Sequence, residues 1–263
     1  MPPEVNLTEV YFKKYGILLK TKEQIEGIRR ACLLAKEILQ KTCAMAKVGV
    51  TTNELNAYAH QLHIDAKAKP APLGYGNPPY PKSICTSLND VICHGIPNDI
   101  PLQEGDFLNI NVSPILGGYY GDCSAMVAVG PIDNEKQKVM DVSYQCLMRA
   151  IAELKPGLPL CKIGEIIASY AELHGCSVVH QFVGHGVGVR FHEPPEVPHH
   201  YNRIATPLAP GMTFTIEPMI NAGAPEATID PNQWTARTID GKPSAQYEHT
   251  VLITETGYEV LTL

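Results

Sequence analysis

The sequence lacks a long apolar run, a run of basic residues and any Cys-x-x-Cys pair. No apolar stretch approaches the roughly 18 residues that cross a bilayer, so we expect no membrane partner. The first residues, MPPEVNLTEVYFKKYGILLK, carry charges through their middle and lack a signal-peptide core, which favours a cytoplasmic protein. A net charge of -6 and a pI near 5.9 argue against nucleic acid as a partner.

Aromatic residues are also few, at 7% of the chain, and Trp234 is the single tryptophan. The eight cysteines lie mostly in apolar segments. Without a secretory signal or a paired motif, they are expected to be free buried thiols rather than disulfides or a zinc ribbon. The chain has 263 residues, of which 44% are hydrophobic and 18% charged, as is ordinary for a globular enzyme.

Two sequence patterns predict helices in the first half. Thr21 to Gln24 and Thr51 to Glu54 have the form of capping boxes, and apolar residues follow each at helical spacing. The second half contains two further helical segments, NEKQKVMDVSYQCLMRAIAEL and CKIGEIIASYAELHG. Between these pairs, SICTSLNDVICHGIP reads as a strand, a turn and a strand, and a hairpin is expected about Gly117 and Gly118.

Three segments of the first half return in order in the second half. For example, CHGIP at 93–97 parallels GHGVG at 184–188, and IPLQEGDFLNINV at 100–112 parallels TPLAPGMTFTIEP at 206–218. The repeat predicts one α+β domain over 21–263, with an internal two-fold relating halves of about 21–131 and 132–263. Residues 1–20 then form an N-terminal extension.

The repeat also predicts where a site would lie. Asn111 and Glu217 each stand six residues after a paired glycine, Gly105 and Gly211, on strands whose apolar neighbours point the other way. A site on the shared axis would therefore receive Asn111 from one half and Glu217 from the other.

Seven polar residues are embedded in apolar strand segments: His94, Asn111, Asp122, His185, His192, Glu217 and Glu248. A buried carboxylate is costly unless something neutralises it, and no lysine or arginine stands nearby in these segments. Three carboxylates with one imidazole match a divalent transition metal, and the oxygen-rich set suits manganese, iron or cobalt better than a structural zinc. Shared carboxylates could also bridge two ions and activate a water between them.

Other polar residues have simpler interpretations. A histidine in a segment such as GHGVG is more often a satisfied core or loop residue than a ligand. His60 and His63, three apart on a helix, are expected to be solvated, and His199 and His200 are assigned no role. Trp234 fits either plain packing or the rim of a pocket.

Five motifs in order give the chain a strong resemblance to the methionine aminopeptidases, from about Thr21 to the end. They are YPKSICTSLNDVICHGIP, GGYYGDCS, GHGVGVRFHEPP, PGMTFTIEPMINAG and WTARTIDGKPSAQYEHT. No inserted helical subdomain separates the motifs of the second half, so the chain resembles type I. The resemblance implies the family's pita-bread fold, which agrees with the repeat.

The resemblance also implies roles for particular residues. The tighter metal would be bound by Asp122, His185, Glu217 and Glu248, and a second metal by Asn111, Asp122 and Glu248. Glu217 would act as general base, while His94 and His192 would hydrogen-bond the substrate and stabilise the reacting centre. The methionine pocket would be lined by Tyr80, Cys85, Phe191 and Trp234, with Tyr75 nearby.

Asn111 departs from the family, which has an aspartate there. An amide offers one neutral carbonyl oxygen where a carboxylate offers two oxygens and a charge, so the second metal should bind weakly. The expected cofactor is cobalt, manganese, iron or zinc. The expected function is removal of the initiator methionine from nascent chains with a small second residue, by a monomer whose contact with the ribosome is left open. The alternatives are a weakened or non-catalytic protein of this fold, or a proline-specific aminopeptidase.

Overall fold

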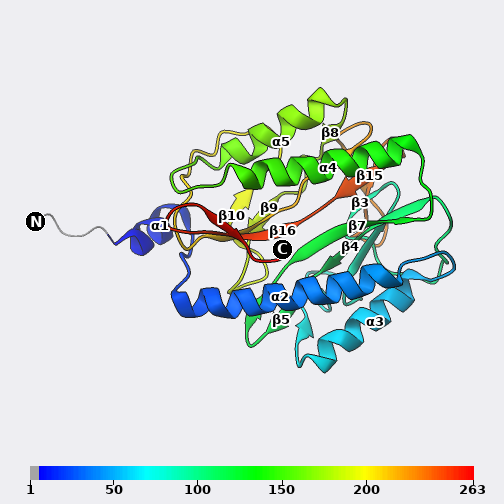
Figure 1. Cartoon of the computed structure of the whole chain (residues 1–263), viewed down its shortest axis with the longest axis horizontal. Coiled ribbons are helices and arrows are strands. Elements are labelled where there is room, and N and C mark those ends of the chain that lie inside the picture. The colour runs from blue at the N-terminus through cyan, green and yellow to red at the C-terminus, as the bar shows by residue number, and fades with distance from the viewer. Residues whose placement is uncertain (1–5) are drawn as a thin grey trace, which may run out of the picture.

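The computed structural model describes residues 6–263 as two pairs of helices with strands packed between them (Figure 1). The lower pair in Figure 1 is α2 (Lys22–Met45) and α3 (Thr52–Asp65), and the upper pair is α4 (Asn134–Ala152) and α5 (Cys161–Leu173). A shorter helix, α1 (Leu7–Tyr15), precedes them. Helices of the first and second halves therefore cover opposite sides of the strands.

In the described part of the chain the strands form five small sheets, and every strand pairing in them is antiparallel. The five-stranded sheet has the order β10 (Glu193–Val197), β9 (Gly184–Gly186), β11 (Thr213–Ile216), β16 (His249–Ile253) and β17 (Tyr258–Val260). Two sheets of three strands each belong to the first half: β2 (Cys85–Leu88), β4 (Asp106–Val112) and β7 (Cys123–Val129); and β1 (Lys69–Pro70), β5 (Pro114–Leu116) and β6 (Tyr119–Tyr120). The remaining two are β15 (Ser244–Gln246), β12 (Met219–Asn221) and β8 (Ser177–Val178); and β13 (Ala227–Ile229), β14 (Ala236–Thr238) and β3 (Val91–Cys93).

The predicted α+β class is confirmed, and so are the local signals that predicted it. The Thr21 hydroxyl accepts a hydrogen bond from the Gln24 backbone, and the Gln24 side chain accepts one from the Thr21 backbone. Thr51 and Glu54 form the same reciprocal pair at the start of α3. Each box satisfies backbone N–H groups that a helix start leaves unpaired, which explains why both helices begin there.

Each pair of helices covers a large apolar core. Residues of α2 and α3, such as Ile38 and Leu55, pack with Leu108 and Ile110 of β4. In the second half, α4 and α5 pack against β11, β12 and β16 in a larger cluster that includes Phe214, and Phe107 and Met126 of the first-half strands join it. Because each pair of helices covers its own strands, polar side chains between the halves can face one another without breaking either core.

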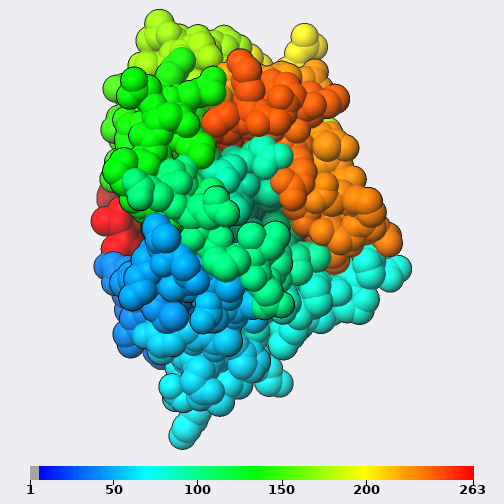
Figure 2. Space-filling model, turned by 90° about the vertical axis from the view of Figure 1, so that its right-hand side faces the viewer, coloured from blue at the N-terminus to red at the C-terminus, as the bar shows by residue number. Residues whose placement is uncertain are grey.

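The two halves are joined by backbone hydrogen bonds beside the predicted site. Ser124 of β7 and Glu248 exchange two of them, with N–O distances of 3.3 and 3.1 Å. Nearby, the Thr250 hydroxyl donates to the Asp122 carbonyl over 2.7 Å. Figure 2 shows a face on which second-half segments, in orange, adjoin cyan and green segments of the first half. The exact two-fold relation between the halves stays a prediction.

The segment before α2 is more firmly attached than its description as an extension suggests. Ile17 and Leu19 are buried, and the Tyr11 hydroxyl donates to the Pro207 carbonyl over 2.9 Å. Lys20 forms an ion pair with Glu193 over 2.6 Å, and the two side chains are only 1% and 6% exposed. This stretch therefore fastens the start of β10 to the rest of the protein.

The expectation that His63 is solvated was wrong. His63 is fully buried, and its Nδ1 lies 2.7 Å from the Ala59 carbonyl, to which it donates. Burial lowers the pKa of His63, so the ring is neutral in this packing. Leu55, Ala59 and His63 stand four apart and form the buried face of α3. His60 is half-buried, and its Nδ1 lies 2.8 Å from the Ser83 hydroxyl.

All eight cysteines are free thiols, of which five are buried and three are half-buried. Within residues 6–263, no helix combines the length and the apolar character needed to span a membrane.

Candidate active site

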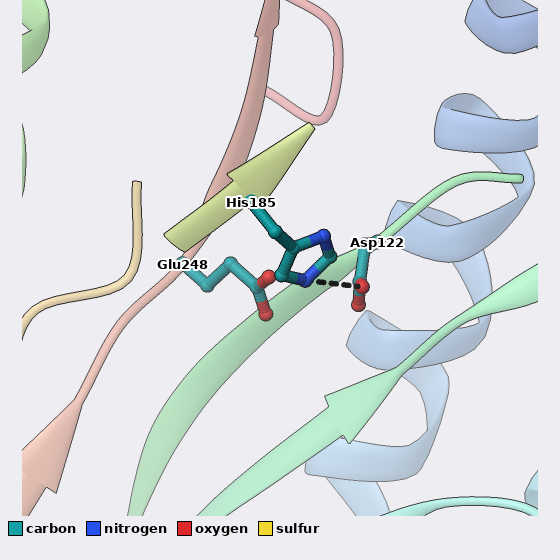
Figure 3. Close-up of side chains that lie close together, drawn as sticks. All are labelled: Asp122, His185 and Glu248. Carbon is teal, nitrogen blue, oxygen red and sulfur yellow. Dashed lines mark ion pairs between the residues drawn. The ribbon is translucent and has the colours of Figure 1, made fainter. Parts of the chain in front are cut away.

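Four of the predicted ligands come from strand ends or short strands and meet between the two halves. Asp122 immediately precedes β7, His185 lies within β9, Glu217 follows β11 and Glu248 precedes β16. One donor atom each from Asp122, His185 and Glu248 lie within 4.8 Å of one another. Figure 3 shows these three side chains pointing towards one another from separate segments. The His185 Nε2 is also 3.6 Å from Glu217 Oε1.

The three carboxylates are buried, and no lysine or arginine within residues 6–263 forms an ion pair with them. Asp122, Glu217 and Glu248 are 3%, 8% and 1% exposed, and burial raises the pKa of each carboxyl group. Within residues 6–263, His185 is the only basic side chain paired with them, and burial lowers its pKa to about 3. Three buried carboxyls and a neutral imidazole therefore fit a divalent cation. Such a cation would offset the free-energy cost of removing the carboxylates from water.

Asn111 lies in β4 at the edge of this cluster. Its Nδ2 donates to Glu248 Oε2 over 2.7 Å, and its Oδ1 accepts from the Ser113 hydroxyl over 3.1 Å. The same hydroxyl lies 2.7 Å from Asp122 Oδ1. The amide thus presents a donor, not a second acceptor, to a carboxylate that the family resemblance assigns to both metals.

Three supporting residues were missed by the sequence analysis, and each lies two positions from a predicted ligand. The Thr215 hydroxyl donates to Glu217 Oε1 over 2.6 Å, and Gln246 Nε2 donates to Glu217 Oε2 over 3.0 Å. Ser113 is the third member. Because side chains two apart on a strand share a face, each could have been found by stepping two residues from Glu217, Glu248 or Asn111.

His199 was assigned no role, yet it supports the same site. Its ring is fully buried, and its Nε2 accepts a hydrogen bond from the Glu217 backbone N–H over 3.2 Å. His199 follows β10 by two residues and reaches Glu217 only through the tertiary fold. No local pattern in the sequence announces this contact.

All predicted catalytic, substrate and metal residues line one cavity of about 720 Å³. The set comprises Tyr80, Cys85, His94, Asn111, Asp122, His185, Phe191, His192, Glu217, Trp234 and Glu248. The cavity also includes residues that the sequence analysis did not name, such as Cys93, Phe182 and Met219. An acidic end and an apolar, sulfur-containing end therefore belong to a single space.

Aromatic side chains give the apolar part of the cavity its shape. The Tyr80 and Trp234 rings meet edge to face with centroids 5.3 Å apart, and Trp234 Nε1 donates to the Pro78 carbonyl over 3.0 Å. Tyr75 lies 5.1 Å from the Phe191 ring and the same distance from the His192 ring. These contacts fix flat, rigid walls that suit an unbranched apolar side chain.

Two histidines stand beside the ligands. The His192 ring centroid is 4.1 Å from that of His185. His94 has a positive φ of 56°, and burial lowers its pKa to about 4, so the ring is neutral. A Cβ on the following residue, Gly95, would lie 2.1 Å from the Thr86 carbonyl oxygen, so only glycine lets the backbone after His94 approach Thr86 this closely. His94 is thereby held in a conformation that side chains rarely adopt.

Comparisons with known proteins agree with this geometry. The chain is 60% identical to the methionine aminopeptidase of Chlamydia muridarum, over 99% of this chain and 90% of that protein. The crystal structure of methionine aminopeptidase from Rickettsia prowazekii superimposes with a TM-score of 0.91 at 43% identity, over 94% of this chain and 100% of that one. The prolidase of Pyrococcus horikoshii shares the fold, with a TM-score of 0.76 at 21% identity over 98% of this chain and 66% of that one.

These likenesses also confirm the predicted pita-bread fold. The family model that matches the chain covers residues 26–255 and is described as metallopeptidase family M24. That span contains every residue of the acidic cluster, and the chain therefore belongs to metallopeptidase family M24.

Proposed function

We propose that this protein is a metal-dependent aminopeptidase that removes the initiator methionine from nascent chains, with a preference for a small second residue. The observation that carries the proposal is the single cavity that joins three buried carboxyls to an aromatic and sulfur-lined slot. Relatives named methionine aminopeptidase at 58% to 60% identity over nearly the whole chain support it. The preference for a small second residue rests on the family resemblance.

Asp122, His185, Glu217 and Glu248 would hold the tighter ion in this proposal. A divalent ion bound there would supply a Lewis acid to the scissile carbonyl and ease deprotonation of the attacking water. The oxygen-rich donors favour cobalt, manganese or iron, with zinc as the remaining candidate.

Glu217 is proposed as the general base. Two hydrogen bonds, from Thr215 and Gln246, fix its carboxylate and leave one lone pair on each oxygen, so that one oxygen would bind the ion and the other would accept the proton of the water. His94 and His192 are proposed to hydrogen-bond the substrate, because neutral imidazoles at the cavity wall can donate to a carbonyl oxygen as its negative charge develops. Tyr80, Cys85, Phe191 and Trp234 would hold the methionine side chain.

The proposal is tested with two peptides, Met-Ala-Ser and Ala-Pro-Ser, on the protein loaded with manganese or cobalt. We expect methionine to be released from the first peptide and no release of alanine from the second. Release from Ala-Pro-Ser alone would move the protein to the proline-specific branch of the fold. No release from either peptide, in the wild type and in Asn111→Asp, would favour a protein that keeps the fold without catalysis.

Asn111→Asp is expected to strengthen the second metal site. The aspartate would replace the hydrogen bond to Glu248 with a second anionic group at the place where the second ion is proposed. We expect the affinity for the second ion to rise by at least about tenfold, while the first site changes little. Calorimetric titration of metal into metal-free protein measures both steps.

Asn134→Asp, an exposed position in the first turn of α4, is the matched control and should leave both affinities unchanged. Two equally tight sites in the wild type would contradict the proposed weakening by Asn111.

The place of action follows from the proposed substrate. Because nascent chains emerge in the cytoplasm, we propose that the protein acts there, as a monomer, on chains that are still short.

A further inference from the structure

The wall of the cavity that β10 supplies carries two carboxylates in different situations. Glu193 and Glu196 both line the cavity. Glu193 is paired with Lys20 and is nearly fully buried. Glu196 is exposed, and within residues 6–263 no ion pair neutralises it. One of the two charges is thus already compensated, and the other is available to a ligand.

Strand pairing sets the direction of the Glu196 side chain. Glu196 lies directly opposite His185 in the antiparallel pair of β9 and β10. Opposite residues in such a pair project from the same face of the sheet, with Cβ atoms about 4.5–5.5 Å apart. Glu196 therefore stands on the face from which His185 reaches the acidic cluster, one strand further out.

The charges around the mouth of the cavity are of one sign. No lysine or arginine within residues 6–263 lines the cavity, whereas Glu196 does. Asp122 and Glu248, which would hold the metal, are buried deep in it, while Glu196 is at its solvent side. A cationic group that reaches the mouth would meet Glu196 with no lysine or arginine among the residues that line the cavity.

A substrate peptide in an extended conformation can bring a cationic side chain to Glu196 at the mouth of the cavity. With its first side chain in the slot and its first peptide bond at the acidic cluster, the chain advances about 3.3 Å per residue towards solvent. We propose that Glu196 is a specificity-determining residue that favours substrates with lysine or arginine at the third or fourth position. The inference rests on the proposed aminopeptidase function and adds a charge preference to it.

The expected size of the preference follows from the exposure of Glu196. Ion pairs at exposed positions are weak, so we expect kcat/KM for a lysine peptide to exceed that for its glutamate counterpart by about two- to fivefold. The difference should appear in KM rather than kcat, because the contact is made equally before and during the reaction. It should shrink as ionic strength rises, since salt screens exposed charges.

Two peptide series test the proposal, Met-Ala-Xaa-Ser and Met-Ala-Ser-Xaa, with lysine, glutamine or glutamate as Xaa. We expect the lysine-to-glutamate ratio of kcat/KM to fall towards one in Glu196→Gln and to invert in Glu196→Lys. Glu255→Gln, an exposed carboxylate outside the cavity, is the matched control and should keep the wild-type ratio. A wild-type ratio of one in both series at low ionic strength would overturn the inference.

A binding measurement keeps the test independent of turnover. Calorimetry with the same peptides on the metal-loaded Glu217→Gln variant should show tighter binding of the lysine peptides, and a further change to Glu196→Gln should remove the difference. Equal release of methionine from all peptides would defeat this inference and leave the proposed function standing. Release from none of them would defeat the proposed function, and equal binding would then defeat this inference as well.

Discussion

Glu217→Gln is expected to lower kcat by roughly 10²- to 10⁴-fold, the range that general acid–base groups contribute. The substitution keeps the size of the side chain but removes its charge and its ability to take a proton. Initial rates on Met-Ala-Ser, measured with saturating metal, give the result. Glu255→Gln, on an exposed turn, is the control and should retain the wild-type rate. A Glu217→Gln variant that retained a tenth or more of the wild-type kcat would place the base elsewhere.

A stability measurement separates this loss from misfolding. In metal-free protein, Glu217 lies among like charges, and both burial and Asp122 raise its pKa. Above a pH of about 8, where Glu217 is ionised in the metal-free protein, the uncharged glutamine relieves part of that repulsion, so the metal-free variant should melt at or above the temperature of the metal-free wild type. The rise in melting temperature on adding metal should be smaller in the variant, because one anionic ligand is gone.

Lys20→Met is expected to cost about 3–5 kcal/mol of unfolding free energy. It leaves Glu193 buried and charged without its partner, and burial already lowers the pKa of Lys20 despite Glu193. Urea denaturation at fixed metal concentration measures the loss. Lys13→Met removes an exposed ion pair with Glu9 and should change stability by no more than about 1 kcal/mol.

A double variant shows whether the buried charge is the cause. Lys20→Met with Glu193→Gln removes both charges and should recover part of the lost stability, which two independent substitutions would not do. If Lys20→Met costs no more than Lys13→Met, the pair has no structural importance. A loss of activity larger than the loss of folded protein would show that β10 also positions His192, which directly precedes Glu193.

Much of the site could be predicted because its chemistry is local in the sequence. Asp122, His185, Glu217 and Glu248 are polar residues in apolar strands, and that contrast is visible without a structure. The residues that support them were harder to find. Thr215, Ser113 and Gln246 follow the period of two along a strand, so their signal was present but unused.

Other features depend on contacts that a sequence does not display. His199 reaches Glu217 across the fold, and the pairing of Ser124 with Glu248 joins strands that are far apart in the chain. His63 was placed in solvent although it continues the apolar face of Leu55 and Ala59 at helical spacing, because its hydrogen-bond partner, the Ala59 carbonyl, is a backbone group that no residue type reveals. Helix α1 was missed because nine residues give too short a window for a helical pattern.

The backbone bridge between Ser124 and Glu248 bears on how the protein is made. Synthesis proceeds from the N-terminus, so Asp122 and His185 leave the ribosome well before Glu248. Until β16 pairs beside β7, the acidic cluster lacks Glu248 and the backbone hydrogen bonds to Ser124 that position it. A growing copy of this enzyme is therefore expected to stay inactive almost to the end of its own translation.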